Sequence, residues 1–160
     1  MIHLNGYLTS LATFCDLVGE AREQVLSDSG GNTSYADGVA TFLALGLSRL
    51  AQTNNTLVRW LIRKTGTSKG TPAFDRQIVS MVWEFSEGNV FAGSVGSWSA
   101  ALKNLLTAFH VLPIQVIPGK AMQLDASREF ITEGAPIVST DPPYFDNIGY
   151  ADLSDFYYVW

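Results

Sequence analysis

The stretch Ala135-Pro136-Ile137-Val138-Ser139-Thr140-Asp141-Pro142-Pro143-Tyr144 predicts the fold of the carboxyl-terminal part of this chain. Its short β-branched run is typical of a buried strand, and the Asp-Pro-Pro-Tyr tetrapeptide that follows is typical of a rigid loop. In an open α/β sheet, ligands bind at the carboxyl ends of the strands. The sequence therefore predicts a binding or catalytic loop at 141–144.

The segments around this stretch alternate between strand and helix patterns. Strands are predicted at 114–117 and 137–140, and helices at 126–132 and 153–160, with Asp152 as the cap of the last helix. This order implies a parallel α/β unit. Two strands cannot form a covered parallel sheet, and the last helix is still apolar at Trp160. We therefore expect the chain to be a piece of a larger protein, with a partial sheet at 113–160.

The first 112 residues are predicted to be mainly helical. Apolar residues recur at helical spacing over 7–27, 34–52, 74–85 and 98–111, and 56–63 is expected to add a further turn. Thr33 or Ser34 is expected to cap the second helix, which is apolar nearly all round and therefore well buried, and Ser97 to cap the helix that begins at Trp98. Loops are predicted at 65–72 and at the Gly-rich stretch 86–98. For that second loop, a plain structural role and a substrate-facing role are equally supported.

The composition indicates a soluble cytoplasmic protein. The chain has 160 residues, of which 47% are hydrophobic and 16% charged, enough for a real core. With one cysteine and two histidines it cannot form an intrachain disulfide, and no metal site is expected. Cys15 is expected to be a small, buried apolar residue. No run is long enough to span a membrane, and the amino terminus lacks the pattern of a signal peptide.

The charge distribution is uneven along the chain. The net charge of −5 argues against binding to nucleic acid, which usually requires a basic surface. Between Arg49 and Arg76, however, six residues are basic and only Asp75 is acidic, whereas from Asp125 onward seven are acidic and only Arg128 is basic. A solvated surface is the favoured interpretation of the basic stretch, and contact with a phosphate backbone is the alternative.

The residue types of the 141–144 loop suit the recognition of an exocyclic amine. An amine on a nucleobase is a poor nucleophile because its lone pair is delocalised into the ring. Hydrogen bonds from both amine hydrogens, to the Asp141 carboxylate and the Pro142 carbonyl, would favour a pyramidal nitrogen and free that lone pair. Tyr144 would stack on the base, which must first leave the duplex. The alternative is an ordinary turn opened by Asp141 and stiffened by proline.

A longer string, Asp141-Pro-Pro-Tyr-Phe-Asp-Asn-Ile-Gly-Tyr-Ala-Asp-Leu-Ser-Asp-Phe-Tyr-Tyr-Val-Trp160, is more specific. It resembles the catalytic segment of a family of large prokaryotic adenine-specific DNA methylases. The resemblance covers the chain from about residue 33 onward and includes Tyr35–Thr41, Met81–Phe85, Asn89–Phe91 and Gly96–Trp98. It implies a class I, Rossmann-like methyltransferase fold with a large helical insertion. It also implies S-adenosylmethionine as methyl donor and DNA as partner.

The resemblance also assigns site residues. Asp141, Pro142, Pro143 and Tyr144 match the catalytic loop, while Phe145, Asp146, Asn147 and Tyr150 match the segment that shapes the substrate pocket. Lys120 and Ala121 stand where such enzymes often contact the donor, although a lysine departs from the usual small or acidic residue. The family's Gly-rich donor loop has no match in this sequence.

We therefore expect an internal fragment, inactive alone, whose other partner is the rest of the parent methyltransferase. Adenine N6 and cytosine N4 remain equally possible targets. Methylation of RNA or of a protein glutamine, and a non-catalytic helical interaction module, are the alternatives.

Overall fold

The computed structural model describes residues 4–62, 64, 66, 68–79, 81–112, 117, 119–125, 137–142, 145 and 148–159. Within these residues the chain is mostly helical, with four helices and one two-stranded sheet. The prediction of a predominantly helical chain is therefore confirmed. No helix among the described residues combines the length and the apolar character needed to cross a membrane.

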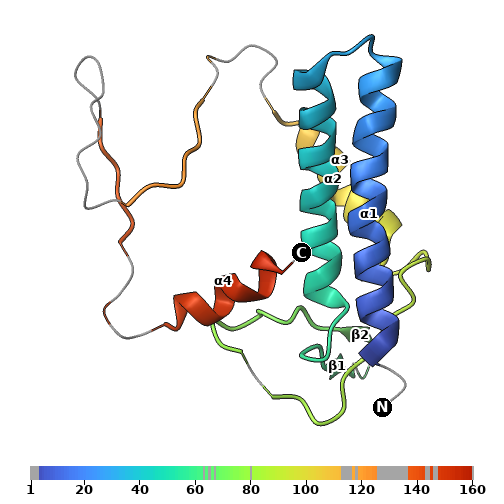
Figure 1. Ribbon diagram of the computed structural model, residues 1–160. Coiled ribbons are helices and arrows are strands. Elements are labelled where there is room, and N and C mark those ends of the chain that lie inside the picture. The colour runs from blue at the N-terminus through green and yellow to red at the C-terminus, as the bar shows by residue number, and fades with distance from the viewer. Residues whose placement is uncertain are drawn as a thin grey trace.

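The first two helices form an antiparallel hairpin (Figure 1). Helix α1 spans Leu4–Asp28 and helix α2 spans Thr33–Thr53, close to the predicted 7–27 and 34–52. Gly30 and Gly31 form the turn with φ values of 66° and 87°, a backbone region in which other residues are strained. An ion pair of 2.8 Å between Arg22 Nε and Asp37 Oδ1 joins the two helices near this turn.

The cap of α2 lies one residue earlier than predicted. The side-chain oxygen of Asn32 accepts a hydrogen bond from the backbone N–H of Tyr35 at 3.1 Å. This places Thr33 and Ser34 inside the helix, so their prediction as caps is wrong. The expectation that α2 is buried all round is also wrong, because Leu45 is exposed.

Helix α3, Trp98–Phe109, crosses the hairpin and completes the core (Figure 1). Ser97 caps it as predicted, accepting a hydrogen bond from the N–H of Ala100 at 3.3 Å. Gly46 allows α3 to lie close to α2, since a Cβ there would be 3.1 Å from Leu105 Cδ1. The core between these elements consists of Leu11, Phe14, Leu47, Leu50, Ala51 and Val90, with Cys15, Trp98 and Phe156 packed against it.

Between α2 and α3 the chain differs from the prediction. Residues 56–62, the described part of the predicted further turn at 56–63, are not helical. Instead, β1 (Trp60–Leu61) pairs antiparallel with β2 (Lys69–Gly70), and Trp60 stands opposite Gly70. The predicted helix at 74–85 is also absent from the described residues, which form bends and irregular chain. Ile78 and Met81 are exposed. Their helical spacing therefore does not produce a helix whose apolar face packs against the rest of the protein.

Helix α4 spans Tyr150–Tyr158 and docks on the body of the molecule through aromatic side chains. The ring of Phe74 lies 5.0 Å from that of Phe156 and 5.8 Å from that of Tyr157, measured between centroids. The helix begins three residues earlier than predicted, and Gly149 is its N-cap residue. Asp152 therefore lies in the first turn rather than at the cap.

The parallel sheet predicted for 113–160 is not seen. Residues 137–140 form no strand, and Ile137 is 99% and Val138 66% exposed. A strand exists only when its backbone groups pair with a neighbour, and none of the described residues pairs with this segment. Of the strand predicted at 114–117 only Ile117 is described, as exposed chain outside any strand. The helix predicted at 126–132 lies outside the described residues.

Candidate functional site

The structure does not bring the sequence-predicted site residues together. Asp141 and Pro142 are exposed and belong to an irregular stretch that Figure 1 shows extending away from the helices. Pro143 and Tyr144 lie outside the described residues. Asp141 and Pro142, the described residues of the predicted catalytic loop, line neither of the two cavities described below, and the segment before them pairs with no strand among the described residues.

The residues expected to hold donor and substrate are equally separate. Lys120 and Ala121 are exposed, Phe145 is 99% exposed, and Tyr150 is exposed at the first position of α4. Asp146 and Asn147 lie outside the described residues. The described residues among them line neither of the two cavities described below. Within the described ranges, no group of three or more His, Cys, Asp or Glu side chains is placed to hold a metal ion.

A large cavity with polar side chains in its lining lies elsewhere, between the end of α2, the β1–β2 pair and the Gly-rich loop. We call it the polar cavity; its volume is about 620 Å³. Side chains able to form hydrogen bonds make up much of its wall, and Trp60 contributes an aromatic ring. Its lining consists of Thr53, Asn54, Trp60, Ser68, Lys69, Gly70, Ser86, Glu87, Gly88, Asn89, Ala92, Ser94, Val95 and Gly96.

Asn54 is the most deeply buried polar side chain of this wall. Its Nδ2 donates hydrogen bonds to the carbonyl of Leu50 at 2.9 Å and to that of Gly96 at 2.7 Å. These two carbonyls fix the orientation of the amide, since an oxygen in the place of Nδ2 would face both. The other side-chain atom, Oδ1, is buried and has no hydrogen-bond partner among the residues that the structure describes. A buried acceptor without a donor is unusual in proteins and marks a place where a donor could bind.

Three glycines allow the walls of the polar cavity to lie close together. A Cβ at Gly70 would be 2.8 Å from Ser86 Oγ and 2.9 Å from Val58 Cγ1, and a Cβ at Gly88 would be 3.0 Å from Asn54 Oδ1. Gly96 has a φ of 92°, which other residues rarely adopt. These glycines therefore let the Gly-rich loop lie against the end of α2 and the β1–β2 pair.

Tyr7 of α1 fixes the same loop from outside. Its hydroxyl donates to the carbonyl of Ser86 at 2.6 Å and accepts a hydrogen bond from the N–H of Gly88 at 3.2 Å. Burial raises the pKa of Tyr7 and the negative charge of Glu87 adds to this, while the hydrogen bond from Gly88 opposes it. The tyrosine is thus neutral at physiological pH, as its role as donor requires.

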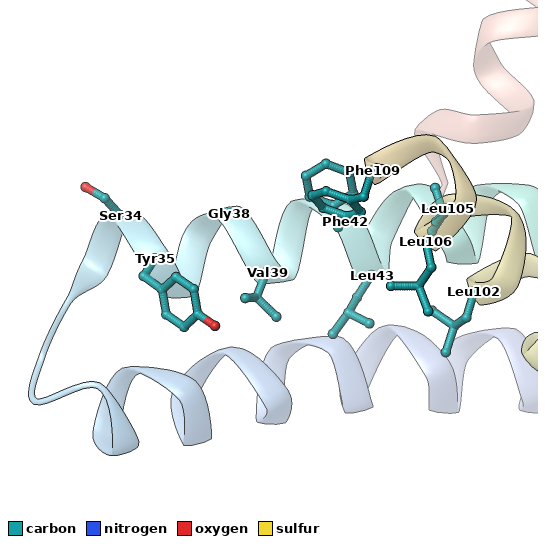
Figure 2. A pocket seen from close by; sticks show the side chains of 10 residues that line it. All are labelled: Ser34, Tyr35, Gly38, Val39, Phe42, Leu43, Leu102, Leu105, Leu106 and Phe109. Carbon is teal, nitrogen blue, oxygen red and sulfur yellow. The ribbon is translucent and has the colours of Figure 1, made fainter. Parts of the chain in front are cut away.

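A second cavity, which we call the apolar groove, lies between α2 and α3. Figure 2 shows side chains of Leu102, Leu105 and Leu106 extending from α3 beside α2. Its volume is about 370 Å³, and the rings of Phe42 and Phe109 stack with centroids 4.0 Å apart. Ser34 and Tyr35 are the only lining residues with polar side chains. The groove can therefore receive an apolar group but holds no set of side chains for catalysis.

Comparison of the chain with protein-family models, with curated proteins and with solved structures finds no match. The candidate site is consequently defined by geometry alone. The sequence pattern indicates the Gly-rich loop as a possible substrate-facing segment, but it does not identify Asn54, Trp60 or Tyr7 as residues of the site. Asn54 carries no local signal for this role, because its partner Gly96 is 42 residues away along the chain.

Proposed function

We propose that this chain carries the catalytic loop of a cytoplasmic, S-adenosylmethionine-dependent methyltransferase that acts on an exocyclic amine in DNA, adenine N6 or cytosine N4. The observation that carries the proposal is the string from Asp141 to Trp160, which resembles the catalytic segment of large prokaryotic DNA methylases. The basic stretch Arg49–Arg76 offers cations for contacts with the DNA backbone.

In this proposal the chain's own residues position the amine. The Asp141 carboxylate and the Pro142 carbonyl each accept one of its hydrogens, and Tyr144 stacks against the ring of the extruded base. The exposure of Asp141 and Pro142 supports a role on a partner molecule, because both are accessible from outside. Catalysis would then come mainly from positioning and from exclusion of water around the amine.

The described residues do not form a site for the methyl donor. Lys120 and Ala121 are exposed and line neither the polar cavity nor the apolar groove. We propose that another part of the parent methyltransferase binds the methyl donor. The same part would supply the strands that form a class I sheet with 137–140. The exposure of the apolar Ile137 and Val138 supports this, since such side chains are normally covered by a sheet and its helices.

The test is methyl transfer to DNA by the parent protein carrying Asp141→Ala, with Asp155→Ala as matched control. Asp155 is likewise an exposed carboxylate, on α4. Loss of a hydrogen bond to a charged group should lower the rate of Asp141→Ala roughly 10- to 150-fold, as expected for about 1.5–3 kcal/mol. The control should retain its rate. Equal rates in the two variants would refute the assigned role of the loop.

A second candidate function is a non-catalytic helical interaction module. The apolar groove favours it, because this concave surface between α2 and α3 carries almost no polar side chains. Under this alternative, Asp141→Ala would leave every activity of the parent unchanged. Phe42→Asp, at the groove, would instead abolish association with the binding partner.

A further inference from the structure

We propose that the polar cavity binds a neutral heterocycle that carries an amino group, of the size of a nucleobase or nucleoside. This inference goes beyond the proposed function, because none of the residues assigned to methyl transfer lines the cavity. The volume of about 620 Å³ lies within the range of small-molecule sites in proteins, roughly 300–1,000 Å³.

The amino group is assigned from Asn54. Its Oδ1 is buried without a partner, and its Nδ2 is held by the carbonyls of Leu50 and Gly96, so the amide cannot turn to present a donor instead. The side chain can therefore only accept a hydrogen bond from a ligand. Gly88 stands beside this oxygen, and any other residue would place a Cβ within 3.0 Å of it. An N–H of the ligand is the group that satisfies this acceptor.

The planar ring is assigned from Trp60. The indole is half-exposed, and its partner across the β1–β2 pair is Gly70, which has no side chain to cover it. Ser86 and Val58 fill the space beside Gly70, so it is the exposed part of the indole that is available to a ligand in the cavity. Aromatic side chains placed in this way stack on nucleobases with little regard to sequence.

The absence of net charge in the ligand follows from Lys69 and Glu87. These residues have opposite charges, and both belong to the cavity wall. A phosphate group would gain from the lysine and lose from the carboxylate. The remaining polar members of the wall, such as Ser94 and Asn89, are neutral groups that suit the hydroxyls of a sugar.

The experiment is a titration of the 160-residue chain with adenosine and with purine riboside, followed by ¹⁵N–¹H NMR. Purine riboside is adenosine with hydrogen in place of the amine, and its free ring nitrogens are all acceptors. Adenosine should shift the amide signals of Gly88, Asn89 and Gly96 in a saturable manner. Purine riboside should bind at least about tenfold more weakly, because its base has no N–H to donate to Asn54 Oδ1. Equal affinities, or no saturable shift with either nucleoside up to about 10 mM, would overturn the proposal.

A pair of tryptophan variants locates the site. Trp60→Ala should weaken adenosine binding by about tenfold or more, as expected for the loss of base stacking. Trp83→Ala is the matched control, since Trp83 is exposed and does not line the cavity. An unchanged affinity in Trp60→Ala would overturn the site. Adenosine 5′-monophosphate binding more tightly than adenosine would overturn the neutral ligand in favour of an anionic one.

The nucleoside comparison requires no substitution, so the proposal stays testable even if Trp60→Ala does not fold. Its outcome is also separate from that of the methyltransferase proposal. The two readouts are distinct, because the amide signals of Gly88, Asn89 and Gly96 report on the wall of the polar cavity, which does not include Asp141.

Discussion

The adjacent residues Asn54 and Asn55 should respond differently to substitution by alanine. Both are buried, and each side chain makes hydrogen bonds at the end of α2. Asn55 bonds only locally, from Nδ2 to the carbonyl of Ala51 at 2.7 Å and from the N–H of Leu57 to Oδ1 at 2.8 Å. Asn54 also reaches the carbonyl of Gly96 at 2.7 Å, and so ties the Gly-rich loop to the helix.

The cost to global stability should be similar in the two variants. Asn54→Ala loses the bonds to Leu50 and Gly96 and a longer one of 3.2 Å to Thr53 Oγ1, whereas Asn55→Ala loses two. At about 1 kcal/mol apiece, each substitution should lower the free energy of unfolding by about 2–3 kcal/mol. Removal of the unpaired Oδ1 partly offsets the loss of the Gly96 contact in the first variant. Urea denaturation followed by circular dichroism at 222 nm measures this quantity.

The local effect should separate the two variants. In Asn54→Ala the Gly96 carbonyl loses its hydrogen-bond partner, which costs the closed loop about 1–3 kcal/mol. Loop opening should therefore become roughly 5- to 150-fold more frequent. Hydrogen exchange at the amides of Ala92 and Ser97, which are bonded within the loop, reports this opening. Asn55→Ala should leave these two amides protected as in the unmodified chain. Equal exchange in both variants would refute the role given to Asn54.

Three further predictions concern the helices and the ionisable groups. Gly38→Ala should stabilise α2 by about 0.5–1 kcal/mol, because its Cβ meets no atom. Gly46→Ala should give no such gain, because its Cβ would crowd Leu105. Equal gains of the two variants in urea denaturation would contradict this. Burial raises the pKa of Tyr7, so its stabilising contribution should be complete below the unfolded value of about 10 and lost as the pH rises through the raised pKa. Tyr7→Phe should be about 1 kcal/mol less stable than the unmodified chain at pH 7, and the difference should shrink in alkaline solution; a constant difference up to pH 12 would argue against this. Burial, with Asp16 adding to it, raises the pKa of the Cys15 thiol, so iodoacetamide should alkylate it more slowly at pH 8 in the folded chain than in urea; equal rates would contradict the shift.

The helices that could be predicted from the sequence are those whose signals are local. Apolar residues at helical spacing located α1, α2 and α3, and Ser97 marked the start of α3 because a cap acts within three residues. The same spacing failed at 74–85. There the apolar residues Ile78 and Met81 find no surface to cover, while Phe74 packs against α4 instead. Periodicity shows that a helix could bury one face, but not whether the fold provides a surface for it.

The polar cavity could not be predicted because its contacts are distant in sequence. Trp60 belongs to a strand only through its pairing with Gly70, and Asn54 acquires its role only when Gly96 reaches it. The loop at 141–144 presents the opposite case. Its residue types predict a chemistry, yet the described residues supply neither the sheet nor the pocket in which that chemistry would occur.

The contact between Tyr7 and Ser86 has a consequence for the order of folding. The two residues are 79 positions apart, whereas α1 and α2 are joined by a short turn. Contacts between distant residues require a large loop to close before they contribute, so the helical hairpin should form well before the tyrosine is bonded. Of these contacts, the hydrogen bond between Tyr7 and Ser86 is then the last to form and the first to break. Fluctuations at the start of α1 would therefore set how often the loop opens and, with it, how quickly a ligand enters or leaves.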